Sequence, residues 1–104
     1  MNQSQLNELQ AAALAKLAIT ELTPMQEEAL TACRQHRDVI LLSPTGTGKT
    51  LAYLLPLIER MQVGVAGVQA IVIVPSRELA LQIDSVWRSM ALPWKAMSVY
   101  GGRA

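Results

Sequence analysis

Four stretches of the chain have the pattern of a helix, and in two of them, residues 5–18 and 51–61, apolar residues recur at the three- and four-residue spacing of an amphipathic helix. This spacing places apolar side chains along one face and is the main sequence signal of a helix. Polar residues suited to cap a first turn stand near the start of three stretches, at Ser4, Thr23 and Ser76. Pro56 lies inside the third stretch, removes one backbone donor and is expected to bend it. The pattern predicts helices over residues 5–18, 24–35, 51–61 and 77–90.

Three short apolar runs separate the later helices, at residues 39–42, 70–74 and 96–100. Short, continuous apolar runs rich in Val and Ile are typical of strands that are buried on both faces of a sheet. Helices that alternate with such strands predict right-handed parallel β-α-β units. The expected fold class is therefore α/β, a parallel sheet flanked by helices, formed by one domain over residues 1–104.

Composition and charge indicate the cellular compartment of the protein but do not indicate its function. Nine Lys and Arg side chains nearly balance eight Asp and Glu side chains, so an argument for nucleic acid must rest on local placement. Cys33, the single cysteine, permits no internal disulfide, fits a small buried helix residue and suggests a reducing compartment. The N-terminus lacks the apolar segment of a signal peptide, and no apolar run approaches the roughly 18 residues of a membrane helix. Together these features predict a cytoplasmic protein with no membrane partner.

The segment Ser43-Pro44-Thr45-Gly46-Thr47-Gly48-Lys49-Thr50 carries the clearest chemistry. It lies between a predicted strand and a predicted helix, where glycines let backbone N–H groups turn inward and a helix N-terminus adds partial positive charge. Lys49 supplies a full positive charge, and the Thr50 hydroxyl is placed to hold a Mg²⁺ ion that bridges the phosphates. The general pattern begins with Gly where this chain has Ser43, so an ordinary strand-to-helix turn is the alternative. The segment predicts a nucleoside triphosphate site formed by Ser43, Thr45, Gly46, Thr47, Gly48, Lys49 and Thr50.

Four further motifs stand in order around this segment: Thr23-Pro24-Met25-Gln26, Leu54-Leu55-Pro56-Leu57, Pro75-Ser76-Arg77-Glu78-Leu79-Ala80 and Gly101-Gly102. Together with the phosphate segment they resemble the N-terminal half of the first RecA-like domain of DEAD-box ATP-dependent RNA helicases. The resemblance extends from about Leu6 to Gly102, nearly the whole chain. It implies a partial RecA-like P-loop fold and a protein that binds ATP and Mg²⁺ and contacts RNA, either single-stranded or as a duplex.

The resemblance assigns the nucleotide contacts. Gln26 matches the glutamine of the family's Q motif, which reads the adenine edge, and a carboxamide offers the donor and the acceptor that this edge requires. The same residue fits a capping box with Thr23, which is the purely structural alternative. Lys49 and Thr50 match the motif I residues for the β/γ-phosphates and Mg²⁺ and would be the catalytic pair.

The resemblance also assigns an RNA contact to the motif Ia residues Pro75, Ser76, Arg77 and Glu78, and to Gly101 and Gly102. In the family the start of this helix binds the sugar-phosphate backbone of single-stranded RNA, and the chain passes close to RNA at the double glycine. A helix N-terminus beside an arginine is physically suited to a phosphate group. The alternatives are a capped surface helix with a solvated Arg77, and an ordinary turn at the two glycines.

The chain also departs from the family. It has Ala18 and Ile19 where the family generally has Gly and an aromatic residue, so aliphatic contact at Ile19 would replace aromatic stacking on adenine. No Asp-Glu-Ala-Asp motif is present to hold Mg²⁺, and there is no second RecA-like domain with its arginine finger. The expectation is a fragment of a longer helicase that is inactive on its own and self-associates through exposed apolar surfaces.

Two other classes of function remain open at this stage. A small P-loop kinase would share the residues Gly46 to Thr50 but would have no use for motif Ia or the double glycine. In a non-catalytic protein the loop would be purely structural. Its glycines would then make folding entropically more costly without binding a ligand in return. RNA-stimulated ATP hydrolysis by the longer protein would separate a helicase from both.

Overall fold

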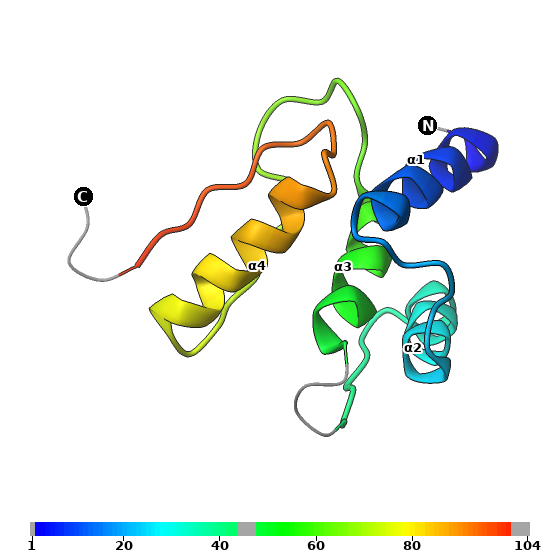
Figure 1. Ribbon diagram of the computed structural model, residues 1–104, viewed down its shortest axis with the longest axis horizontal. Helices are drawn as coiled ribbons and strands as arrows, with labels where there is room; N and C mark the ends of the chain where they lie inside the picture. Colours follow the sequence, from blue (N-terminus) through cyan, green and yellow to red (C-terminus); the bar gives the residue numbers. More distant parts are fainter. Residues whose placement is uncertain (1, 44–47, 101–104) are drawn as a thin grey trace. The chain divides into compact units, whose positions relative to one another are not determined.

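The computed structural model describes residues 2–43 and 48–100 of the chain. Within them it contains four helices, α1 (Gln3–Lys16), α2 (Pro24–Gln35), α3 (Lys49–Arg60) and α4 (Arg77–Ser89) (Figure 1). All four lie where the sequence predicts helices, and their ends differ from the prediction by two residues or fewer. The helices are divided between two compact units: Met1–Ile19 with Gln62–Ala104 form the first, and Thr20–Met61 form the second.

Side-chain caps determine where three of the helices begin. Thr23 caps α2 and Ser76 caps α4, as predicted. The prediction that Ser4 caps α1 is wrong, because Asn2 takes that position. The Asn2 side chain accepts a hydrogen bond from the Gln5 backbone at 2.8 Å, and the Gln5 side chain accepts one from the Asn2 backbone at 3.0 Å. This reciprocal pair satisfies two backbone donors at once, which favours Asn2 over Ser4.

The predicted parallel sheet is wrong for the part of the chain that the structure describes, because no residue there is in a strand. The three apolar runs, residues 39–42, 70–74 and 96–100, have irregular structure (Figure 1). Ile40 is 88% exposed, and Leu42 and Ile73 are each 90% exposed. A parallel strand needs a neighbouring strand to pair its backbone and cover its side chains. An apolar, β-branched composition favours burial of a segment but does not supply that neighbour, so the expected α/β, RecA-like architecture is not found.

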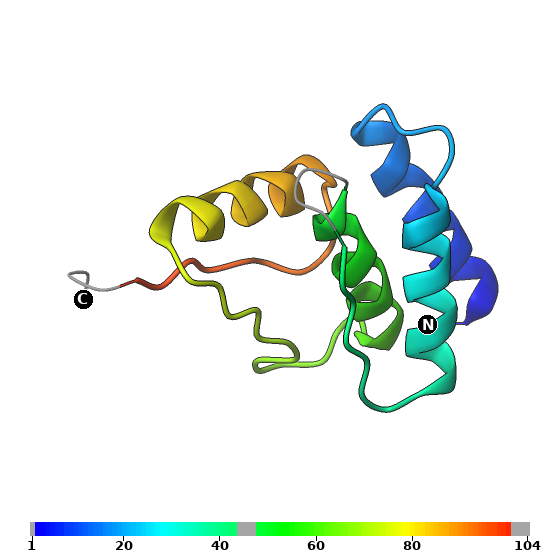
Figure 2. The same cartoon turned by 90° about the horizontal axis from the view of Figure 1, so that it is seen from below.

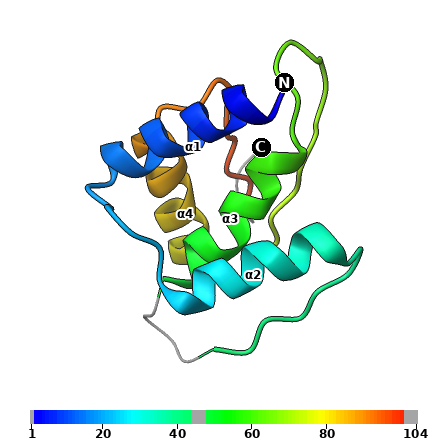
Figure 3. The same ribbon diagram turned by 90° about the vertical axis from the view of Figure 1, so that its right-hand side faces the viewer.

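In the second unit, α2 and α3 pack against each other. They run parallel and side by side, because Gln26 contacts Gly48 at their N-terminal ends while Arg34 contacts Glu59 at their C-terminal ends (Figures 2 and 3). α3 continues through Pro56 without interruption. The apolar core of these helices consists of Ala29, Leu30, Leu51, Ala52, Leu54, Leu55 and Ile58.

Polar contacts join the C-terminal ends of this helix pair. The Arg34 Nε atom lies 3.1 and 3.0 Å from the two Glu59 carboxylate oxygens. The hydrogen bond to Glu59, together with the attraction of its charge, raises the pKa of Arg34 against the opposing effect of partial burial. The Arg60 guanidinium donates to the backbone carbonyls of Cys33 and His36, which the end of α2 leaves without helical partners. Arg60 therefore caps α2 from the neighbouring helix.

In the first unit, two tryptophans and two glutamines tie the end of α4 to the segment that begins at Gln62. The Gln69 side chain accepts from the Gln62 backbone N–H at 2.7 Å and donates to its carbonyl at 2.8 Å. Trp94 Nε1 donates to the same carbonyl, and Trp87 Nε1 donates to the Trp94 carbonyl, both at 3.0 Å. The two indole rings lie 6.5 Å apart between centroids. These contacts hold Trp94 against the end of α4, and residues 94–100 then run alongside α4 (Figure 1).

α1 ends in a tight turn at Ala18. The Ile19 N–H bonds to the Leu14 carbonyl at 2.9 Å, and the Ala18 N–H bonds to the Ala15 carbonyl at 3.0 Å. This is the hydrogen-bond pattern of a Schellman motif, which requires a left-handed residue just after the helix. Ala18 meets that requirement with φ of 57°. An alanine therefore occupies a backbone conformation that favours glycine.

Candidate functional site

The last two residues of the predicted phosphate-binding segment, Lys49 and Thr50, are the first two residues of α3. Gly48 is its N-cap residue and adopts the left-handed conformation with φ of 81°, and none of the described side chains caps it. The first N–H groups of a helix have no partner within the helix, and together with the helix dipole they attract an anion. Lys49 and Thr50 open the helix and are half-buried, as is Ser43 before it. The predicted contacts Thr45, Gly46 and Thr47 lie outside the described residues.

Gln26 joins the start of α2 to the start of α3. Its side chain is buried, at 4% exposed, and accepts a hydrogen bond from the Thr23 N–H at 3.0 Å. Its own backbone N–H donates to the Thr23 hydroxyl at 3.2 Å, which completes the capping box. The Nε2 atom also donates to the Gly48 carbonyl at 3.1 Å. The capping box, which was the structural alternative, is therefore present, and the same side chain also contacts Gly48.

Two observations favour a glycine at position 48. Its φ of 81° is a conformation that side chains with a Cβ rarely adopt. A Cβ at this position would also lie 2.6 Å from Gln26 Nε2, closer than atoms can pack. The contact between Gln26 and the nucleotide segment thus depends on the absence of a side chain at Gly48.

The start of α4 carries the predicted motif Ia residues Pro75, Ser76, Arg77 and Glu78, and all four are exposed. Ser76 accepts a hydrogen bond from the Leu79 N–H at 3.2 Å. The Arg77 guanidinium lies 4.7 Å from the centre of the Tyr100 ring, a cation–π distance. Gly101 and Gly102, which follow Tyr100, lie outside the described residues. The structure therefore brings Arg77 next to the residue that precedes the double glycine.

The predicted site residues belong to both units. Gln26, Ser43, Gly48, Lys49 and Thr50 lie in the second unit, whereas Ile19 and the motif Ia residues lie in the first. Ile19 is half-buried at the end of the turn after α1. The sequence reasoning missed Tyr100 as a functional neighbour, although an aromatic residue directly before two glycines was a usable signal.

No group of three or more His, Cys, Asp or Glu side chains in the described part of the chain is arranged to hold a metal ion. Thr50 is the predicted metal contact, and its hydroxyl would act together with phosphate oxygens and water.

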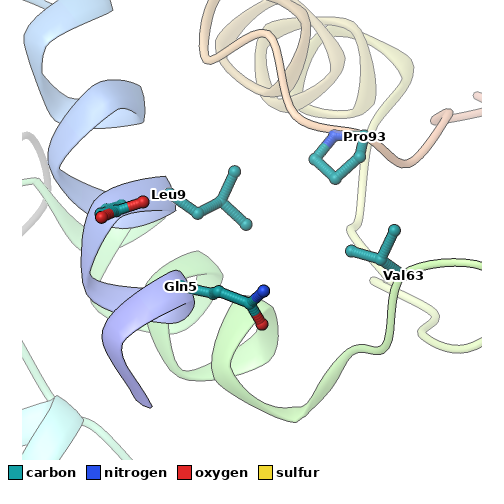
Figure 4. Close-up of a pocket in the computed structure, with 5 residues that line it drawn as sticks. Gln5, Leu9, Val63 and Pro93 are labelled. Atoms are coloured by element: carbon teal, nitrogen blue, oxygen red, sulfur yellow. The ribbon is translucent and has the colours of Figure 1, made fainter. Parts of the chain in front are cut away.

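A pocket of about 530 Å³ lies in the first unit, and none of the five residues that line it is a predicted contact. Gln5, Glu8 and Leu9 of α1 line one side of it, and Val63 and Pro93 face them across the space (Figure 4). The Gln5 side chain is already engaged in the cap of α1. Since the lining offers few free polar groups, the pocket adds nothing to the candidate site.

Comparison with known proteins defines the class. The chain belongs to the DEAD/DEAH box helicase family, whose model matches residues 23–104. No solved structure matches the chain.

Similar relatives are named as RNA helicases. The chain is 49% identical over 76 residues to "Probable ATP-dependent RNA helicase YfmL" of Bacillus subtilis. The aligned residues make up 73% of this chain and 19% of that protein. It is 36% identical over 93 residues to "DEAD-box ATP-dependent RNA helicase CshA" of Geobacillus kaustophilus. Here the aligned residues make up 88% of this chain and 20% of that protein. The chain thus spans about a fifth of the length of these relatives. Within the described residues, no helix has the length and apolar character needed to cross a membrane.

Proposed function

We propose that this chain is the ATP-binding and RNA-contacting portion of an ATP-dependent, cytoplasmic RNA helicase. Family membership and the names of the relatives support this function over a small P-loop kinase. The observation that carries it is the start of α3, where a left-handed Gly48 opens a helix that no described side chain caps. In a chain of this family, such a terminus is suited to bind the phosphates of ATP.

Lys49 and Thr50 would perform the phosphate chemistry. The Lys49 ammonium would neutralise charge on the β/γ-phosphates, while the Thr50 hydroxyl would hold Mg²⁺. Thr45, Gly46, Thr47 and Gly48 would add backbone donors, with Ser43 at the entry to the segment. Mg²⁺ would supply the charge that draws the phosphate oxygens together.

Gln26 retains the hydrogen-bonding capacity to read adenine. A carboxamide has two N–H donors and two oxygen lone pairs. One donor is used on the Gly48 carbonyl and one lone pair on the Thr23 N–H. The remaining donor and acceptor match the two groups on the adenine edge. In this proposal Ile19 adds aliphatic contact to the base.

The start of α4 would contact the RNA backbone through Pro75, Ser76, Arg77 and Glu78, and Gly101 and Gly102 would be a further contact. The N-terminal amides of α4 and the Arg77 guanidinium are both suited to phosphate. The Tyr100 ring supports this arrangement because it lies under the Arg77 guanidinium and limits where that group can point.

Two partners complete the proposal. A second RecA-like domain would close over the nucleotide and supply an arginine finger, so this chain alone would not hydrolyse ATP. A second copy of the chain would associate through the exposed apolar runs, in which Ile40 and Ile73 lie largely in solvent.

The test of the nucleotide site is Lys49→Ala in the proposed full-length helicase. Loss of the cation nearest the phosphates should abolish ATP turnover, measured as phosphate release with and without RNA. Lys95→Ala removes the same charge from an exposed position outside the segment and is expected to leave turnover unchanged. Wild-type turnover in Lys49→Ala would refute the site, and turnover that RNA does not stimulate would favour the kinase.

A further inference from the structure

Residues 94–100 run back along α4, from the C-terminal end of the helix to its N-terminal end (Figures 1 and 2). The Trp94 carbonyl accepts from Trp87 Nε1 at 3.0 Å, and the centre of the Tyr100 ring lies 4.7 Å from the Arg77 guanidinium. Every second residue of the segment, from Trp94 to Tyr100, is half-buried, and the residues between them are exposed. A period of two is that of an extended chain, so Tyr100 lies on the same side of the segment as Trp94.

The length of the segment fits this placement. An extended chain from Trp94 to Tyr100 spans roughly 20 Å, and α4 rises roughly 15 Å between Arg77 and Trp87. Trp94 is fixed at one end by its contacts with Trp87 and with the Gln62 carbonyl, so the other end reaches the first turn of α4. Contacts at the far end of the helix therefore help to set the position of the Tyr100 ring.

Two arginines of α4 are held in different ways. Arg88 Nε lies 3.1 Å from each Asp84 carboxylate oxygen, which occupies that N–H donor and compensates the charge. Arg77 forms no ion pair with the described residues, and the face of the Tyr100 ring holds it instead. An aromatic ring attracts a guanidinium through its π electrons, and it does not occupy the five N–H donors as a carboxylate does. Arg77 is thus held with its charge and its donors available.

We propose that Tyr100 is a positioning residue for Arg77: its ring holds the guanidinium at the start of α4 and leaves the N–H donors available to an RNA phosphate. An exposed arginine loses side-chain freedom when it binds, and a guanidinium that is already held loses less. This inference rests on the proposed RNA contact of Arg77. It goes beyond that contact, because RNA affinity should then depend on an aromatic ring that does not itself touch RNA.

The experiment measures the binding of labelled single-stranded oligouridine to the full-length helicase at several salt concentrations. Tyr100→Leu removes the aromatic ring and keeps an apolar side chain. Tyr100→Phe is the matched control, because it keeps the ring and removes only the hydroxyl. Arg77→Ala and the double variant that combines Arg77→Ala with Tyr100→Leu complete a double-mutant cycle, which separates an effect through Arg77 from a direct one.

Tyr100→Leu should weaken binding by about two- to fivefold, the equivalent of one exposed cation–π contact, and should keep the wild-type salt dependence because no charge is lost. Tyr100→Phe should bind as wild type does. The double variant should bind as weakly as Arg77→Ala alone, because a ring that acts only through Arg77 then has nothing to position.

Three outcomes would overturn the inference. Wild-type affinity in Tyr100→Leu would show that the ring does not matter. A loss in Tyr100→Phe would assign the effect to the hydroxyl. Additive losses in the double variant would show that Tyr100 contacts RNA itself.

Wild-type affinity in Arg77→Ala would refute the proposed RNA contact but not the contact between Arg77 and Tyr100. The NMR signals of the Arg77 side chain in the RNA-free chain then decide, because protons held over an aromatic ring shift upfield. An upfield shift that persists in Tyr100→Phe and is lost in Tyr100→Leu supports the positioning of Arg77 by the ring, and unshifted signals in the wild-type chain overturn it.

Discussion

Ala18 and Gly48 both adopt a left-handed backbone conformation, which suits glycine and strains alanine. Both residues have positive φ at a helix terminus, 57° after α1 and 81° before α3. Gly48 adopts it without steric cost, whereas the Ala18 methyl group crowds the neighbouring carbonyl. The resemblance to DEAD-box helicases implies a glycine where this chain has Ala18, and the Schellman turn is a physical reason for such a preference.

Replacing Ala18 with glycine should therefore stabilise the chain. We expect Ala18→Gly to raise the free energy of unfolding by roughly 0.5–1 kcal/mol, because the relief of left-handed strain exceeds the added chain entropy. Ala15→Gly is the matched control: it lies inside α1, is exposed, and should lower the free energy of unfolding by a similar amount. Denaturant unfolding followed by circular dichroism measures both, and a destabilised Ala18→Gly would contradict this explanation.

Arg77 offers the second test at the level of one residue. Arg77→Ala in the full-length helicase should weaken RNA binding about equally for all sequences and lower the slope of affinity against salt by about 1, as one lost phosphate contact predicts. Arg88→Ala is the control, because Arg88 lies at the other end of α4 and pairs with Asp84. Loss of affinity for only some RNA sequences would contradict a backbone contact.

At the scale of elements, α2 and α3 form the most extensively packed pair of helices in the described part of the chain. Leu54, Leu55 and Ile58 are almost fully buried in α3, and Gln26 and Arg60 fix the two ends of the pair. The Arg34–Glu59 pair adds little, since Arg34 is 51% exposed and surface ion pairs contribute about 1 kcal/mol or less. Apolar contact therefore holds the two helices together, and polar contacts set their register.

Truncation of a core side chain tests whether apolar contacts hold α2 and α3 together. Leu54→Ala should lower the free energy of unfolding by about 2–5 kcal/mol, because it removes apolar contacts and leaves a cavity. Ile40→Ala, at a residue 88% exposed, should change it by less than about 0.5 kcal/mol. Similar losses in the two variants would mean that Ile40 is covered in solution.

The helices could be predicted from the sequence because their signals are local. Thr23 and Ser76 are each within three residues of the N–H groups that they cap. The cap at Asn2 could also have been predicted, because Gln5 stands three residues later, but Ser4 is an equally suitable capping residue. The predicted strands failed because pairing depends on distant segments, which composition does not reveal. For the same reason the Gln26–Gly48 contact and the approach of Arg77 to Tyr100 required the structure.

At the scale of the whole molecule, the apolar surface left in solvent is the feature that most needs an explanation. The three apolar runs expose Ile40, Leu42, Ile73 and Met97 at 87–90% each. Exposed apolar side chains grouped along the chain favour association with other surfaces.

We expect the chain to self-associate. Its mass by light scattering should rise with concentration above the 11.3 kDa of one chain, with binding of a dye specific for exposed apolar surface. Ile73→Lys should reduce the association, whereas Gln82→Lys adds the same charge on an exposed part of α4 and should not. A clean monomer at high concentration that binds no dye would contradict this prediction.

The parallel arrangement of α2 and α3 has an electrostatic consequence. Two helices that lie side by side in the same direction place like partial charges together, so their macrodipoles repel each other. Arg34 and Arg60 offset the negative ends. At the positive ends Glu27 lies in the first turn of α2, whereas α3 has no acidic residue in its first turn, so the compensating charge at α3 would have to come from an anion. A polyphosphate bound there would relieve the repulsion as well as occupy a site, so that nucleotide loading would tighten the packing of one helix on the other and raise the melting temperature of the pair.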